Sequence, residues 1–313
     1  MNKILKKIPP VAYMLVLMII VFSFMSPNYL TVANFRNVLI QATPLMIVAF
    51  GQTCIVLTQG TDLSLGALVS FTTVFSAWLA NKAGIPIGIA IILAICVTTL
   101  LGVINGIVVA HGKVPPFIAT YGMQNIANSL SLLLTSGASI YFYSPFYQFI
   151  TEKNIIGLPI MVWAAVLVFI MVYIVLNRTK FGAYIHGIGG NREALELAGI
   201  NVKRVHVATF AFAAFIAGIA GFITLCRVES GQPTVATGWE FQAVAASLLG
   251  GSSLREGKGN VTGTILGVLM IQMIKNGLNV SGVKAIMQNA IIGSVVLAAI
   301  IIDALIRNRA SSK

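Results

Sequence analysis

Long apolar stretches separated by short polar segments constrain this chain more than any other feature of its sequence. Only 9% of its 313 residues are charged, 58% are hydrophobic, and its mean hydropathy is +0.93. A soluble domain carries about 25% charged residues, which it needs to cover its surface. A soluble enzyme, a disordered protein and a disulfide-bonded secreted scaffold are therefore excluded, and we expect most of the surface to face lipid.

Ten segments are candidates for helices that cross a bilayer, a task that takes about 20 apolar residues. The segments cover residues 11–26, 38–58, 63–80, 85–109, 117–134, 160–176, 207–226, 240–250, 262–274 and 285–305. The second, third, eighth and ninth are short, Gly-rich or interrupted by polar residues. Such broken spans are tolerated where protein or water covers the backbone, and they are typical of the working part of a transporter. We predict an all-α polytopic membrane protein with about ten transmembrane helices in one domain, residues 1–313.

The distribution of basic residues predicts the orientation of the chain. The net charge is +12, but the basic residues are scattered between apolar runs, so membrane orientation explains them better than a nucleic-acid partner does. If the N-terminus is cytoplasmic, most of the 20 basic residues lie in inner segments. Ten spans then place both termini inside, the loop 135–159 outside and the loop 177–206 inside. The aromatic residues of the outer loop predict either an interfacial belt or a docking surface.

The inner loop 177–206 contains a candidate two-turn helix. Asn191 is a suitable N-cap, and Gly199 is a suitable residue just after the helix end. Ala194, Leu195 and Ala198 are expected to share one face. A helix this short is not stable alone in water, so it fits a groove on another protein, with a solvated loop as the alternative.

Motifs for chemistry within this chain are absent. The nearest approach to a P-loop, residues 251–259, has five residues between its glycines and Gly259 after Lys258. The histidines and cysteines have no metal-ligand spacing, and no span carries a paired acid and base, so neither a catalytic residue nor a metal site is predicted. The acidic residues lie in loops or at span ends, and none is expected to be buried deeply. This argues against ion coupling and places the energy source outside the chain.

Neutral polar residues within the spans are candidates for a translocation path. They either form hydrogen bonds between helices or line a route for a neutral polyhydroxyl solute. The candidates are Gln41, Gln52, Asn105, Gln124, Asn125 and Asn128.

Five stretches of the sequence, in order along almost the whole chain, resemble the signatures of ribose-type ABC importer permeases. They are Gly60–Gly66, Gly112–Thr120, Ile188–Ile200, Gly238–Leu254 and Asn276–Val283. Two departures stand out: Gln242 replaces an acidic residue that the family commonly has, and Thr61 replaces its usual Ile. The role of residue 242 and the identity of the solute are therefore left open.

The resemblance implies a membrane subunit of a bacterial importer for a monosaccharide or similar small polyol, located in the cytoplasmic membrane. It implies a second permease copy or paralogue as partner, an extracytoplasmic solute-binding protein, and a cytoplasmic ATPase that uses ATP and Mg²⁺, with no cofactor in this chain. The ATPase-coupling residues are then Gly190, Asn191, Arg192, Glu193, Ala194, Leu195, Ala198 and Gly199. The structural motif residues are Gly60, Asp62, Ser64, Gly66, Glu240, Gly250 and Gly251, and the outer cations Arg36, Lys153 and Arg227 are candidates for docking the binding protein.

Two alternatives remain at this point. One is a stand-alone secondary transporter. The other is an ABC permease for a different small polar solute, such as an autoinducer, a nucleoside or a furanose sugar. The sequence does not choose between these solutes, because the binding protein usually sets selectivity.

Overall fold

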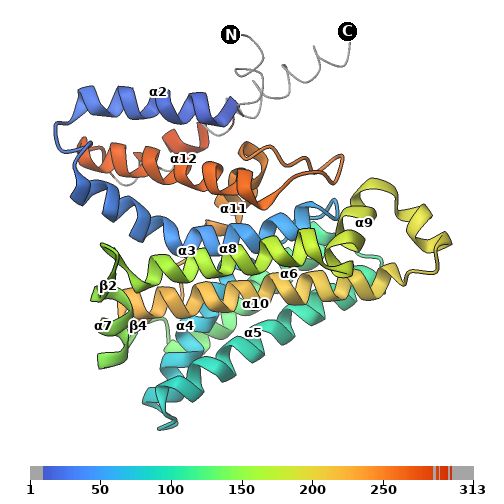
Figure 1. Cartoon of the computed structure of the whole chain (residues 1–313). Coiled ribbons are helices and arrows are strands. Elements are labelled where there is room, and N and C mark those ends of the chain that lie inside the picture. The colour runs from blue at the N-terminus through green and yellow to red at the C-terminus, as the bar shows by residue number, and fades with distance from the viewer. Residues whose placement is uncertain (1–9, 285–286, 289, 295–296, 298–313) are drawn as a thin grey trace, which may run out of the picture.

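Helices make up most of the computed structural model, which describes residues 10–284, 287–288, 290–294 and 297 (Figure 1). The helices are α2 (Pro10–Met25), α3 (Val32–Val56), α4 (Leu65–Asn81), α5 (Ile87–Ala110), α6 (Pro116–Thr135), α7 (Pro145–Glu152), α8 (Ile160–Arg178), α9 (Lys180–Leu197), α10 (Val202–Val228), α11 (Trp239–Leu249) and α12 (Val261–Val280). The strands have two residues each: β1 (Ile140–Tyr141), β2 (Asn154–Ile155), β3 (Leu158–Pro159) and β4 (Ser230–Gly231).

The predicted class of all-α polytopic membrane protein is confirmed in its main feature. Among the described residues, five helices are long and apolar enough to cross a membrane, namely α3, α5, α8, α10 and α12. Helices α2 and α4 are apolar but shorter, and α11 has only 11 residues. The predicted span 285–305 lies largely outside the described residues. The count of ten spans and the N-in/C-in orientation therefore stay predictions.

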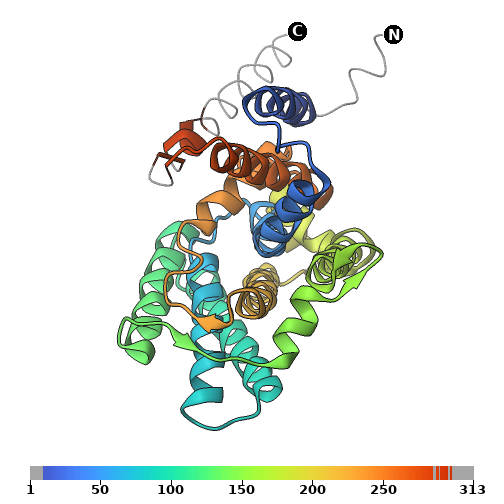
Figure 2. The same cartoon turned by 90° about the vertical axis from the view of Figure 1, so that its left-hand side faces the viewer.

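Helix α10 lies at the centre of the bundle, with α3, α4 and α5 packed around it (Figure 2). Small residues on α5 allow the closest of these approaches. A Cβ atom added to Gly106 would lie 2.6 Å from the Cα atom of Val207 on α10. Since apolar side chains gain little by leaving lipid, such backbone-to-backbone packing is what holds membrane helices together.

Gly106→Leu is expected to destabilise the bundle, because the new side chain would force α5 away from α10. Overpacking of this kind costs about 1–3 kcal/mol or more. The measurement is thermal unfolding of the purified protein in detergent. Gly88→Leu is the matched control, since Gly88 is on the same helix and nothing lies within 4 Å of its added Cβ atom. Equal losses in the two variants would contradict the packing argument.

The stretch 232–238 explains why the third and eighth predicted spans look broken. This non-helical stretch joins β4 to the short helix α11 and packs against α4. Side chains of α4 accept hydrogen bonds from its backbone: Ser70 Oγ from Ala236 N at 3.1 Å, and Thr73 Oγ1 from Gln232 N at 3.3 Å. The hydroxyl groups that make α4 weakly apolar therefore satisfy backbone groups that would otherwise be buried without a partner.

The two loops singled out in the sequence lie at opposite ends of the bundle. The outer loop 135–159 forms β1, α7, β2 and β3 at one end, whereas α9 lies at the other (Figure 1). Strand β1 pairs antiparallel with β4, with Ile140 opposite Gly231, and β2 pairs antiparallel with β3. The start of α2 lies at the end that carries α9 (Figure 1).

Candidate functional site

The last part of α9, together with the two residues that follow it, forms a separate short helix, residues 191–199. It is called the arm helix below. Asn191 breaks α9 with φ −155° and ψ 92°, and its Oδ1 atom accepts a hydrogen bond from Ala194 N at 3.0 Å. Gly199, at φ +79°, ends the helix, and the amide of Ile200 donates to Leu195 O at 3.0 Å. Both predicted caps are therefore present, and they satisfy backbone groups at each end of the helix.

The arm helix is exposed along nearly its whole length. Of the predicted coupling residues, only Leu195 is partly buried, because its side chain packs over Gly187. The largest apolar side chain that faces solvent, beside the exposed Ala194 and Ala198, is Leu197, which is 91% exposed and was not among the predicted coupling residues. The spacing of Ala194, Leu197 and Ala198 (i, i+3, i+4) was the signal that could have identified this face.

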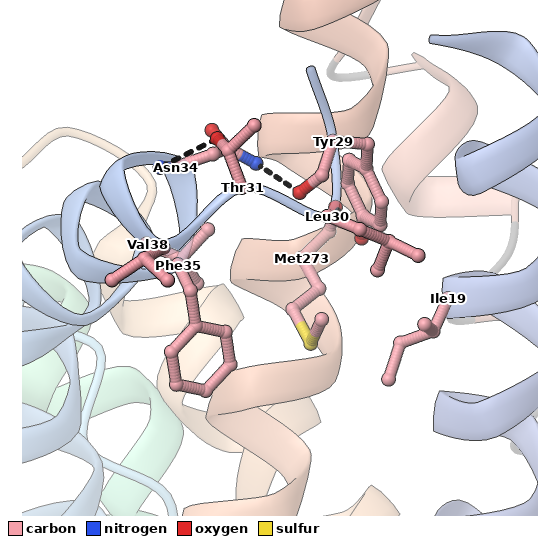
Figure 3. Close-up of a pocket in the computed structure, with 9 residues that line it drawn as sticks. Ile19, Tyr29, Leu30, Thr31, Asn34, Phe35, Val38 and Met273 are labelled. Atoms are coloured by element: carbon pink, nitrogen blue, oxygen red, sulfur yellow. Dashed lines mark hydrogen bonds between the residues drawn. The ribbon is translucent and has the colours of Figure 1, made fainter. Parts of the chain in front are cut away.

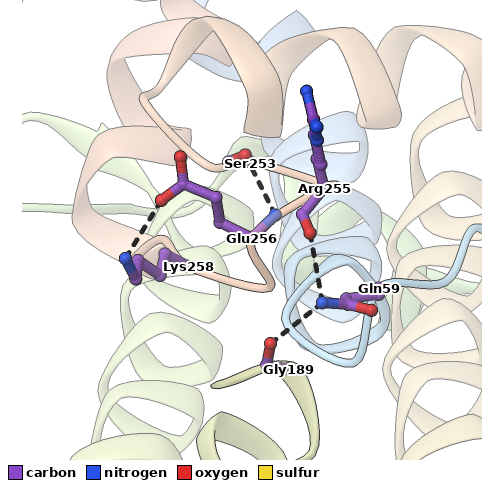
Figure 4. A network of polar contacts seen from close by, with 6 residues as sticks. All are labelled: Gln59, Gly189, Ser253, Arg255, Glu256 and Lys258. Carbon is purple, nitrogen blue, oxygen red and sulfur yellow. Dashed lines mark hydrogen bonds and ion pairs between the residues drawn. The ribbon is translucent and has the colours of Figure 1, made fainter. Parts of the chain in front are cut away.

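The base of the arm is fixed to two other parts of the bundle (Figure 4). The Gln59 Nε2 atom donates hydrogen bonds to Gly189 O at 2.9 Å and to Arg255 O at 3.1 Å. Gly189 also packs directly against Gly257, with no room for a side chain. The base of the arm helix, at Gly189, therefore contacts both the end of α3 and the loop between α11 and α12. A displacement of the arm helix would be transmitted to both.

The motif residues 60–66 form a buried polar hub where α3 meets α4. The Asp62 carboxylate is fully buried and accepts hydrogen bonds from Ser64 N at 2.8 Å and Ser64 Oγ at 2.6 Å. Asn105 on α5 donates to Ser64 Oγ at 3.0 Å, and Thr120 on α6 accepts from Leu63 N at 3.0 Å. This hub holds the starts of α4 and α6 against α5.

A second buried carboxylate lies nearby at the start of α11. Glu240 is 2% exposed, and its Oε1 atom accepts a hydrogen bond from Gln124 Nε2 at 2.9 Å. Its carboxylate lies against Gly66, and Oε2 has no hydrogen-bond partner among the described residues. The expectation that no acid is buried is therefore wrong for Asp62 and Glu240. Both lie at helix ends, as predicted, but other helices cover those ends.

Two of the remaining motif glycines, Gly250 and Gly251, lie where α11 approaches α12, and the third, Gly60, lies after α3. Gly250 packs directly against the backbone of Gly263, and Gly251 has φ +94°. Gly60 packs against Ile55 at the end of α3.

The candidate path residues are divided between the interior and the surface of the chain. Gln52 and Asn105 are buried. The side-chain amide of Gln52, in the orientation that satisfies both of its polar atoms, donates to Asp62 O at 3.0 Å and accepts from Asp62 N at 3.2 Å. Gln124 is bound to Glu240. Gln41 and Asn125 are exposed, and Asn128 is partly exposed. Three of the six candidates, Gln52, Asn105 and Gln124, are therefore bonded in the interior, and the other three lie at or near the surface of the chain.

Two of the candidate docking cations come together at the outer-loop end of the bundle. Arg36 Nη2 donates to Asn154 Oδ1 at 2.6 Å, and Lys153 lies over the Phe149 ring at 4.9 Å. Arg227 lies at the same end of the bundle, partly buried at the end of α10 and just before β4.

An apolar cavity of about 280 Å³ opens between α2, the start of α3 and α12 (Figure 3). Its few polar side chains are already bonded within the chain: Asn34 donates to Tyr29 O at 2.8 Å, and Tyr29 Oη donates to Met273 O at 3.2 Å. A sugar needs several free hydrogen-bonding groups in its site, so this cavity is not suited to one.

Comparison with known proteins agrees with this architecture. Residues 34–302 match the family described as branched-chain amino acid transport system, permease component. The chain is 34% identical to the ribose import permease protein RbsC of Escherichia coli strain K12, covering 92% of this chain and 91% of that protein. It is 36% identical to RbsC of Bacillus subtilis strain 168, covering 96% and 93%. The D-allose transport system permease AlsC of E. coli is 30% identical over 94% and 90%. No solved structure matches.

These matches make the chain a transport permease, which is a transport subunit and not an enzyme. The chain belongs to the transport-system permease component family, and within it to the ribose-type ABC importer permeases.

Proposed function

We propose that this chain is the membrane subunit of an ATP-driven importer for a monosaccharide. The observation that carries the proposal is the likeness to ribose import permeases over more than 90% of both chains. The likeness to an allose permease extends the candidates to hexoses. The relatives differ in their named sugars. Their likeness therefore supports the class of solute, and uptake experiments identify the particular sugar.

The arm helix is the proposed contact with the ATPase. Its caps make it rigid, Leu197 presents an apolar side chain to solvent, and Gln59 connects its base to α3 and to the loop after α11. Closure of the ATPase on ATP would move the arm, and the packed base would transmit that motion to the helices around the hub. Alternating access then follows from a rearrangement driven from outside the chain.

The same geometry supports positions for the other proposed partners. An extracytoplasmic binding protein would dock at the end that carries the outer loop, where Arg36 is bonded to Asn154 and Lys153 lies over the exposed ring of Phe149. A second permease, identical or a paralogue, would complete the pathway. The arm would face the cytoplasm of a bacterium, with the chain N-in/C-in in its inner membrane.

The named relatives, which are import permeases, argue against the stand-alone alternative, and the buried acids do not decide it. A secondary transporter needs a carboxylate that is available to its coupling ion. One oxygen of each acid is bonded within the chain, Asp62 Oδ1 to Ser64 and Glu240 Oε1 to Gln124, whereas Asp62 Oδ2 and Glu240 Oε2 have no partner among the described residues. These bonds support a positioning role for both acids.

Uptake of labelled ribose, allose and galactose tests the substrate class. Cells without their own permease for these sugars would express this chain together with its cognate ATPase and binding protein. We expect ATPase-dependent uptake of at least one of the sugars. Uptake of none, with uptake of a nucleoside or another polar solute by the same assembly, would favour the second kind of ABC permease.

A further inference from the structure

A second cavity, of about 420 Å³, lies beside the base of the arm. Gln59, the residue that fixes the arm to α3, is part of its wall. The wall also includes Lys113 from the turn between α5 and α6, Lys203 from the first turn of α10, and Arg192 from the arm helix itself. The cavity therefore joins the arm to three other parts of the bundle.

The charge of this cavity is strongly one-sided. Three cations line it, and no Asp or Glu does. Arg192 shares its charge with Glu196, at 2.9 Å in an exposed ion pair. Lys113 and Lys203 form no ion pair within the part of the chain that the structure describes. Bringing these like charges together is unfavourable unless an anion lies between them.

His206 supplies an independent sign of an absent ligand. This side chain lines the same cavity and is 9% exposed, and its Nδ1 atom has no hydrogen-bond partner among the described residues. Buried polar atoms are almost always paired with a protein group, a water molecule or a ligand. A group with several oxygens in this cavity would give His206 a partner and would neutralise the lysines at the same time.

We propose that this cavity binds a phosphate group, held by Lys113, Lys203 and Arg192. With Arg192 partly neutralised by Glu196, the positive charge left over is enough to neutralise a phosphate diester, which carries about −1, or a phosphate monoester, which carries about −1.5 to −2 at neutral pH. The planar guanidinium and the two ammonium groups are suited to its several oxygens. The cavity is within the usual size range of small-molecule sites, about 300–1,000 Å³. The phosphate comes either from a small soluble molecule or from the headgroup of an anionic lipid.

Occupancy would act on the arm, because the ligand would connect Arg192 to the bundle. A bound phosphate would hold the arm helix against the turn between α5 and α6 and thereby restrict the motion that the ATPase has to drive. The binding itself does not depend on which sugar is carried, so its test stands apart from the test of the proposed function.

Binding of inorganic phosphate to the full-length permease in phosphatidylcholine nanodiscs tests the soluble source, by calorimetric titration at constant ionic strength. Thermal unfolding in phosphatidylglycerol and phosphatidylcholine nanodiscs tests the lipid source. Lys113→Gln and Lys203→Gln should each weaken phosphate binding about tenfold or more, or remove the stabilisation by phosphatidylglycerol. Lys180→Gln is the matched control, because Lys180 is an exposed lysine of α9 outside the cavity.

Saturable phosphate binding that both cavity variants weaken would assign a soluble ligand, and an effect confined to phosphatidylglycerol would assign a lipid headgroup. The proposal would be overturned by the absence of both effects, or by equal losses in Lys180→Gln. It would also be overturned if the cavity variants lost only binding of the ATPase, because that result would assign the cavity to an acidic side chain of the partner.

Discussion

Leu197→Asp is expected to weaken binding of the ATPase subunit by about thirtyfold or more and to remove most ATP-driven uptake. Leu197 is the most exposed apolar side chain of the arm helix, and truncating such an anchor commonly costs about 2 kcal/mol or more at a protein interface. The substitution also places a charge in a contact that would be dehydrated. The measurements are equilibrium binding of the purified ATPase to the permease in nanodiscs, and uptake by the complete assembly.

Ala183→Asp is the matched control for this variant. It adds the same charge to the exposed surface of the same helix, α9, but before the break at Asn191. It should retain binding and uptake. If Leu197→Asp binds the ATPase as tightly as the native chain does, then the arm helix is not the contact and the coupling role proposed for it is wrong.

Asp62→Leu is expected to lower the stability of the bundle by about 2–4 kcal/mol and to reduce the yield of folded protein. The leucine has the branched shape of aspartate but cannot accept hydrogen bonds, so the buried amide of Ser64 would lose its partner at 2.8 Å. An unpaired buried donor costs about 1–3 kcal/mol, and bonds to a charged group contribute more than neutral ones do. Thermal unfolding in detergent measures the change.

Asp62→Asn separates hydrogen bonding from charge at this position. The asparagine retains a carbonyl oxygen that can accept from Ser64, so it should recover most of the stability that leucine loses. If the leucine variant unfolds at the native temperature, the hub does not stabilise the start of α4. If asparagine and leucine lose equal stability, the negative charge of Asp62 matters more than its hydrogen bonds.

The features that sequence reasoning predicted well are local ones. The caps of the arm helix, Asn191 and Gly199, act on amides within a few residues of themselves, so the sequence around them is enough to place the helix. The same holds for the long apolar runs, since each produces a helix whose position depends on its own composition. These features carry the membrane class and the arm.

The features that it missed depend on contacts between distant segments. Glu240 was expected near an exposed helix end, but α6 and Gly66 cover it, and neither is near it in the sequence. The hydroxyls of Ser70 and Thr73 made α4 look less like a span. Their partners are backbone groups of the stretch 232–238, about 160 residues further along the chain, so the sequence did not reveal those bonds. The basic cavity likewise joins residues from separate elements.

The central claim is that this permease obtains its energy from a partner through the arm helix. It is tested most directly in proteoliposomes that contain the permease and its ATPase. The binding protein and labelled sugar are added on the side of the membrane where the binding protein docks. The account predicts uptake only when hydrolysable ATP is present on the ATPase side, and loss of that uptake in Leu197→Asp but not in Ala183→Asp. Concentrative uptake by the permease alone, driven by an ion gradient without ATP, would contradict it.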